Sequence, residues 1–235
     1  MRLLITRDEA SAERTAVALR AHGHEPIVAP LFGIEILSEV EPEDAPWDAI
    51  LLTSVNALRG VCTWKGRWRD VPAFAVGDRT AQAMREQGFT AVTSAAGDVN
   101  DLADLVVARL TPPARLLYLA GEERVGDLAG VLRARNFAVD LVQVYRVVAA
   151  QTLPPSAAAA LNGEIDGVLH FSRRSAEAFL TAARNSGLLE AALNKPVHYC
   201  LSARIAEPLR EAGAADVRAA DRPDEAALLA LISPE

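Results

Sequence analysis

The chain has 235 residues, of which 51% are hydrophobic and 23% are charged, as in ordinary soluble globular proteins. A formal net charge of −7, without a basic stripe interleaved with aromatic residues, excludes a typical nucleic-acid-binding protein. No segment approaches the roughly 18 uninterrupted apolar residues of a membrane span, and two cysteines outside any CxxC pattern favour neither a disulfide framework nor a zinc site.

The first segment, residues 3–6, is a short apolar run that ends in a threonine and predicts a buried β-strand. Because this strand pattern begins at once, we expect no signal peptide and a cytoplasmic location. A helical pattern follows over residues 10–21 and stops before Gly23, which suits a glycine cap at the end of a helix.

Residues 31–41 and 141–149 contain stretches that alternate in polarity, as exposed strands of a two-stranded ribbon do. Proline-containing segments at 42–46 and 151–155 mark boundary loops beside them. Elsewhere, short aliphatic runs alternate with helical segments of about ten to fifteen residues, which is typical of parallel sheets with crossover helices. The two ribbon segments are therefore expected to connect two α/β lobes.

The same α/β unit occurs twice in the chain. The run at 48–54 begins with an acidic residue and ends with a hydroxyl residue, and so does the run at 166–172. The strand and helix pattern at 74–88 matches that at 199–213, and each ends in a glycine. Internal repeats of this kind indicate two similar structural units.

The duplication is split. The first copy continues to Tyr145, but the second copy ends at Glu235 without this continuation, whose counterpart lies at the N-terminus. Residues 1–30 with 150–235 are therefore expected to form lobe 1, and residues 42–140 lobe 2. Each lobe is predicted to be a parallel five-stranded sheet flanked by helices. Because two such lobes would be joined by two chain segments, we expect a ligand-binding cleft between them.

Several catalytic classes lack their motifs. No GxGxxG follows the first strand, and the phosphate-loop spacing from Gly121 to Gly126 is followed by Asp127 where lysine is required. Neither GxSxG nor HExxH occurs, and the histidines form no pair with metal-ligand spacing. A Schiff-base lysine has Lys65 and Lys195 as its candidates. The missing motifs argue against a nucleotide-binding enzyme, a serine hydrolase and a metalloenzyme, and the two lysines leave few candidates for a Schiff base.

Hydroxyl residues and glycines occupy the expected carboxyl ends of strands in both lobes. In open α/β sheets ligands bind at these ends, where helix N-termini direct N–H groups and a partial positive charge outward. Each hydroxyl residue could instead cap the helix that follows it, but the recurrence in both lobes favours a site for a multiply charged anion. The residues concerned are Thr6, Arg7, Ser54, Gly77, Gly121, Ser172, Arg173 and Ser202.

Three motifs occur in a fixed order: Thr53-Ser54-Val55-Asn56-Ala57, Val76-Gly77-Asp78-Arg79-Thr80-Ala81 and Val144-Tyr145-Arg146. Together with the N-terminal Leu4-Ile5-Thr6-Arg7, they resemble the uroporphyrinogen-III synthase family nearly from end to end. The resemblance implies two lobes linked by a two-stranded ribbon. It also implies a cofactor-free cyclisation of hydroxymethylbilane to uroporphyrinogen III, with loss of water and inversion of the terminal pyrrole ring.

By the same resemblance, Tyr145 is the candidate acid for the loss of water, although a tyrosine that packs beside the ribbon remains an alternative. Ser54, Asn56 and Thr80 belong to the matching motifs and would contact the substrate. The substrate carries acetate and propionate groups on every ring, and guanidinium groups bind carboxylates in a bidentate manner. The candidate donors are Arg7, Arg146, Arg173, Arg174 and Arg204.

The C-terminal part departs from the family pattern. Ser202-Ala203-Arg204 stands where a Gly-x-Thr-Thr-Ala-like turn is usual, and Arg173 follows Ser172 where proline is common. A non-enzymatic two-lobe binding module for a polyanionic small molecule is the alternative, and the lack of a DNA-binding appendage counts against it. We expect a monomer that binds a tetrapyrrole and neither nucleic acid nor membranes.

Overall fold

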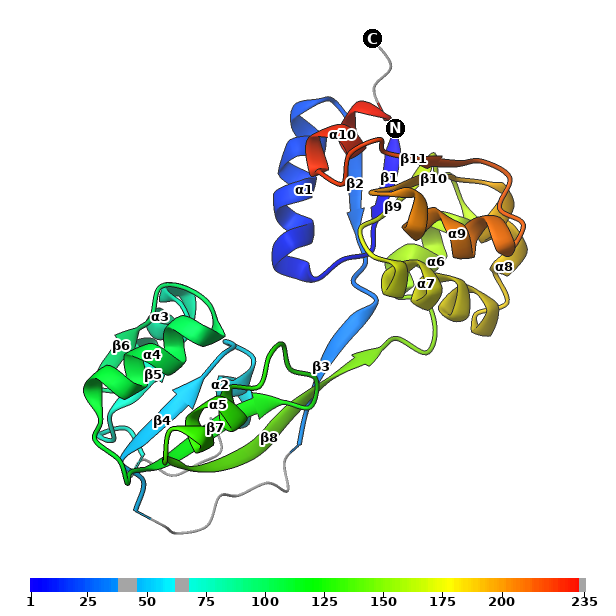
Figure 1. Ribbon diagram of the computed structural model, residues 1–235. Helices are drawn as coiled ribbons and strands as arrows, with labels where there is room; N and C mark the ends of the chain where they lie inside the picture. Colours follow the sequence, from blue (N-terminus) through cyan, green and yellow to red (C-terminus); the bar gives the residue numbers. More distant parts are fainter. Residues whose placement is uncertain (38–45, 62–67, 233–235) are drawn as a thin grey trace. The chain divides into compact units, whose positions relative to one another are not determined.

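The computed structural model describes residues 1–37, 46–61 and 68–232. The chain divides into two compact units. Unit 1 consists of Met1–Gly33 and Val148–Glu235, and unit 2 consists of Ile34–Val147. Each unit contains one sheet with helices against it (Figure 1).

Unit 1 has a five-stranded sheet with the order β11-β10-β9-β1-β2, in which neighbouring strands are parallel. In the central ladders Leu4 lies between Ile27 and Val168, so the N-terminal strand is paired with the C-terminal part of the chain. The strands are β1 (Arg2–Ile5), β2 (Glu25–Val28), β9 (Gly167–His170), β10 (Val197–Cys200) and β11 (Val217–Ala219).

Helices cover both faces of this sheet. Leu3 and Ile5 pack in one buried cluster with residues of α1 and α10, whereas Leu4 packs in another with residues of α6 and α7. This follows from the strand period, because successive side chains point to opposite faces. The helices are α1 (Glu9–Ala21), α6 (Pro155–Asn162), α7 (Arg173–Asn185), α8 (Leu189–Asn194), α9 (Ala203–Glu211) and α10 (Glu225–Ala230).

Unit 2 has a six-stranded sheet with the order β3-β8-β7-β4-β5-β6. The five strands from β8 to β6 are parallel, in agreement with the prediction, and β3 adds a sixth strand at the edge. The strands are β3 (Phe32–Ile36), β4 (Ala49–Leu52), β5 (Ala73–Ala75), β6 (Val92–Ser94), β7 (Arg115–Gly121) and β8 (Ala138–Ala149).

The sheet of unit 2 is also covered on both faces. Ile50 and Leu52 share a cluster with α2 and α3, and Leu51 shares the other cluster with α4 and α5. Asp98 caps α4 through a capping box in which Asp101 accepts from the Asp98 backbone N–H at 2.7 Å. The helices are α2 (Ala57–Val61), α3 (Asp78–Glu86), α4 (Val99–Arg109) and α5 (Leu128–Ala134).

The segments expected to form a separate ribbon belong to β3 and β8. With 12 residues, β8 is longer than β7, so its second half extends past that neighbour and remains next to β3 (Figure 1). Beyond β3, the N–H of Leu37 donates to the carbonyl of Val144 at 3.1 Å. Residues 38–45, which include the end of the expected ribbon and the start of the expected lobe 2, lie outside the described ranges.

None of the helices in the described ranges is long and apolar enough to cross a membrane. Cys200 is buried, and burial raises the pKa of its thiol to about 12. Lys195 donates from Nζ to the carbonyl of Leu161 at 2.7 Å. Cys62 and Lys65, the other cysteine and lysine, lie outside the described ranges.

Candidate functional site

A pocket of about 180 Å³ lies in unit 2 at the carboxyl ends of β4, β5 and β7. This is the edge at which open α/β sheets bind their ligands. Three of the residues proposed from sequence, Ser54, Gly121 and Tyr145, line it together. The remaining lining residues are Thr53, Val76, Val99, Glu123, Arg124 and Val125.

Tyr145 reaches this pocket because residue 121 has no side chain. The ladder between β7 and β8 shifts register at Gly121, which pairs with Tyr145 after Ala120 has paired with Gln143. A Cβ atom on Gly121 would lie 2.7 Å from Cζ of Tyr145. The tyrosine is buried, and its carbonyl accepts a hydrogen bond from the N–H of Glu122 at 2.9 Å. The phenol therefore lies against the end of β7.

Two small hydroxyl residues, Thr53 and Ser54, line the same pocket at the end of β4. Thr53 and Tyr118 share a hydrogen bond of 3.1 Å between Oγ1 and the phenol oxygen. Burial raises the pKa of Tyr118, although this hydrogen bond and the positive charge of Arg124 oppose the effect. Ser54 accepts from the N–H of Asn56 at 3.2 Å, so it turns the chain before α2 as well as lining the pocket.

The loop from β7 to α5 forms one side of the pocket. Arg124 donates from Nη1 to the carbonyls of Gly121 and Glu122, each at 3.2 Å. Val125 is 90% exposed, and Asp127 caps α5 by accepting from the N–H of Gly130 at 2.9 Å. The sequence signal in this loop is the spacing from Gly121 to Gly126, which fails as a phosphate loop because Asp127 replaces lysine and which does not point to Arg124. Consequently Arg124 was missed as a candidate.

Four other candidates in unit 2 do not line this pocket. Gly77 precedes α3, and Thr80 is buried in its first turn. Asn56 lies in the turn before α2. Arg146 makes a bidentate contact with Glu35 at 2.7 and 3.0 Å on the exposed β3–β8 pair. The hydrogen bonds of this pair raise the pKa of Arg146.

In unit 1, the candidates at the end of β1 make structural contacts. Thr6 is buried and donates to the carbonyl of Leu169 at 3.1 Å, which ties β1 to β9. The guanidinium of Arg7 lies 4.2 Å from the centre of the Phe171 ring and 3.3 Å from a carboxylate oxygen of Glu225. Thr6 is thus closed off from solvent, and the charge of Arg7 is already paired.

The candidates that follow β9 lie at the start of α7. Ser172 caps the helix by accepting from the N–H of Ser175 at 3.0 Å. Arg173 contacts Glu177 at 2.8 Å and Glu207 at 2.6 Å, and these hydrogen bonds raise its pKa. Arg174 stacks over the ring of Phe32 at 4.9 Å.

Ser202 directly precedes α9, and its side chain makes no capping hydrogen bond there. Arg204, in the first turn of the same helix, is exposed. Among the residues described, no three histidine, cysteine or carboxylate side chains are grouped so that they could hold a metal ion. The residues that line the unit 2 pocket therefore bring together a phenol, small hydroxyls, the guanidinium of Arg124 and the carboxylate of Glu123.

The family model of uroporphyrinogen-III synthase (HemD) matches residues 13–230, which is nearly the whole chain. The chain belongs to the uroporphyrinogen-III synthase family. No curated protein matches it significantly.

Solved uroporphyrinogen-III synthases resemble the chain along almost its full length. The enzyme from Helicobacter pylori 26695 is 19% identical with a TM-score of 0.58, over 99% of this chain and 98% of its own. A structure of the Thermus thermophilus enzyme is also 19% identical, with a TM-score of 0.41 over 97% of this chain and 96% of its own. The similarity to the Helicobacter pylori enzyme shows a shared fold.

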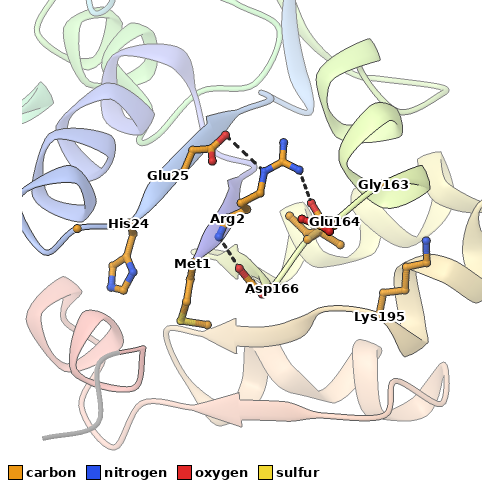
Figure 2. A pocket seen from close by; sticks show the side chains of 10 residues that line it. Met1, Arg2, His24, Glu25, Gly163, Glu164, Asp166 and Lys195 are labelled. Carbon is orange, nitrogen blue, oxygen red and sulfur yellow. Dashed lines mark hydrogen bonds and ion pairs between the residues drawn. The ribbon is translucent and has the colours of Figure 1, made fainter.

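A larger pocket of about 600 Å³ lies in unit 1 of this family member, at the amino ends of β1, β2 and β9 (Figure 2). In this pocket Arg2 forms an ion pair with Glu25 at 3.4 Å and donates to the carbonyl of Glu164 at 2.8 Å. The N–H of Arg2 donates to Asp166 at 2.6 Å. This pocket lies at the amino ends of its strands, whereas α/β sheets bind ligands at the carboxyl ends, and no candidate residue lines it. We therefore favour the smaller pocket.

Proposed function

We propose that this protein is a uroporphyrinogen-III synthase, which cyclises hydroxymethylbilane to uroporphyrinogen III with loss of water and inversion of the terminal pyrrole ring. The observation that carries this function is the family match over residues 13–230. The reaction is a lyase-type step of tetrapyrrole biosynthesis.

The reaction requires few catalytic side chains. The pyrrole nitrogen donates electrons as the bond between the hydroxymethyl carbon and its oxygen breaks, and the oxygen leaves as water after it gains a proton. The resulting azafulvene is attacked by the substituted carbon of the last ring, which gives a spiro intermediate. Because the substrate supplies the electron density, positioning and charge stabilisation can carry the reaction without a cofactor.

We assign the proton donor to Tyr145. Its phenol lines the unit 2 pocket beside Ser54 and Gly121, and a positioned acid is worth roughly 10²–10⁴-fold in rate. Ser54 and the backbone at Gly121 would then contact the ring held against this phenol. We also retain as proposals a monomeric enzyme and a cytoplasmic location.

The decisive experiment supplies the protein with enzymatically generated hydroxymethylbilane and separates the oxidised porphyrin isomers by chromatography. A synthase yields mainly isomer III. A binding module without activity leaves isomer I dominant, because spontaneous closure proceeds without inversion. Light scattering on the eluting protein tests the monomer separately.

A further inference from the structure

The arginines of the two units differ in whether a carboxylate already pairs with them. Arg7, Arg146 and Arg173 each form an ion pair with a glutamate. Within the ranges that the structure describes, Arg124 forms none, and its hydrogen bonds go to two backbone carbonyls. Carbonyl oxygens hold the side chain without cancelling its charge. Arg124 therefore keeps a positive charge available for a ligand.

The position of Arg124 relates it to Tyr145. Both line the same pocket, and Nη1 of Arg124 is held 3.2 Å from the carbonyl of Gly121, the residue against which the Tyr145 ring lies. A guanidinium has five N–H donors, so this anchoring leaves Nε and Nη2 able to bind both oxygens of a carboxylate. An anchored side chain also loses less conformational freedom on binding.

The next residue adds an apolar contact. Val125 lines the same pocket and is 90% exposed. A cation beside an exposed aliphatic side chain matches a ligand whose apolar ring bears acidic arms. Hydroxymethylbilane has this character, because each of its pyrrole rings carries an acetate and a propionate group.

We propose that Arg124 binds a carboxylate of the pyrrole ring held at Tyr145, with Val125 packed against that ring. This contact contributes to the binding of a carboxylate-bearing substrate. The inference rests on the proposed function and adds a substrate-binding residue that the sequence motifs did not indicate. Arg124 is exposed, so its replacement should not disturb the fold.

The test compares steady-state kinetics of Arg124→Gln with the unmodified protein. A charge-assisted hydrogen bond at an exposed site predicts a rise of about tenfold in KM. The kcat should stay within about twofold, because the contact exists in both the ground and the transition state. Arg124→Lys should recover part of the loss. Arg109→Gln is the matched control, since it removes an exposed arginine of the same unit outside the pocket.

Equilibrium binding of uroporphyrin, followed by its fluorescence, separates this inference from the proposed function. Arg124→Gln should bind it about tenfold more weakly, and added salt should weaken binding less than in the unmodified protein. If the unmodified protein makes isomer III while both KM and uroporphyrin affinity are unchanged in Arg124→Gln, the inference is wrong and the function stands. If isomer III is not made, the function is wrong and the binding comparison alone decides the role of Arg124.

Discussion

The ring of Tyr145 fills the space beside Gly121 that a side chain on residue 121 would need. A Cβ atom there would lie 2.7 Å from Cζ and 2.9 Å from the phenol oxygen of Tyr145. Heavy atoms cannot approach so closely without displacement, so the orientation of the phenol depends on glycine at this position. The proposed acid is thus positioned by the end of the neighbouring strand.

Gly121→Ala should displace the phenol and lower kcat at least about tenfold, since misplacing a reacting group by an ångström can cost more than this. The overpacked position should also lower the free energy of unfolding by about 1–3 kcal/mol. Isomer-resolved activity and urea unfolding measure the two effects.

Gly33→Ala serves as the control, because a Cβ there would lie 3.9 Å from Val148, an ordinary contact. It should leave both quantities near those of the unmodified protein. Full activity in Gly121→Ala would show that the phenol orientation does not matter for turnover.

Removing the phenol oxygen of Tyr145 tests its proposed role directly. Tyr145→Phe should lower kcat by roughly 10²–10⁴-fold at most and leave measurable turnover, because the substrate ionises readily. Tyr118→Phe is the matched comparison: it loses the hydrogen bond to Thr53 and should cost about 1 kcal/mol of stability, with a much smaller effect on kcat. Equal rates in Tyr145→Phe and the unmodified protein would assign Tyr145 to packing.

The sequence contained enough to place the strand ends. Short apolar runs followed by hydroxyl residues or glycine located the ends of β1, β4, β7 and β9, because period and turn residues are local signals. These local signals indicate Ser54 and Gly121 as candidates without any knowledge of their tertiary neighbours. Alternation in polarity indicated that the two ribbon segments pair with each other, as β3 and β8 do, but it did not reveal that β8 also joins this pair to the sheet of unit 2.

The partners of the arginines could not be read in the same way. Arg173 is paired with Glu207, which comes from a different helix, so the contact depends on how α7 and α9 pack. Arg124 lies in a loop without periodicity. It is distinguished by its hydrogen bonds to the backbone carbonyls of Gly121 and Glu122. Whether an arginine is paired with a carboxylate or available to a ligand depends on tertiary contacts, which local sequence patterns do not show.

The unit 2 segment, residues 34–147, should fold when produced alone. Its two described clusters, around Leu52 and Leu51, draw their buried residues from within this segment, and a domain with its own core can fold independently. Residues 148–235 alone should not fold, because β9 would lose its pairing with β1. Amide dispersion in NMR spectra of both fragments checks this. An unfolded 34–147 fragment would contradict the proposed division of the chain.

Two buried histidines of unit 1, His170 and His198, make the protein sensitive to acid. His170 and His198 lie side by side with 3.0 Å between Nε2 and Nδ1, and Nε2 of His198 lies 3.0 Å from the carbonyl of Ala192. Because a carbonyl can only accept, Nε2 of His198 carries the proton and its Nδ1 accepts from His170. Among described residues, Nδ1 of His170 has no hydrogen-bond partner. Because burial lowers the pKa of both rings, each is neutral in the folded protein near pH 7.

Burial lowers the pKa of both rings, to about 4 for His198, and the proximity of His198 lowers that of His170 further. Since an unfolded histidine has a pKa near 6.5, the unfolded state binds more protons below that pH. The contribution of these two histidines to the free energy of unfolding should be constant above about pH 7.5 and fall as the pH decreases towards 4. At pH 5 the protonation of His198 in the unfolded state alone should lower the free energy of unfolding by about 2 kcal/mol.

Urea unfolding at pH 7.5 and pH 5 measures this loss. His198→Gln keeps a donor for Ala192 but no longer titrates, so its loss between the two pH values should be smaller by about 2 kcal/mol. His22→Gln, which changes an exposed histidine of α1's C-terminal cap, should behave like the unmodified protein. The same pH dependence in His198→Gln as in the unmodified protein would show that the acid sensitivity arises elsewhere.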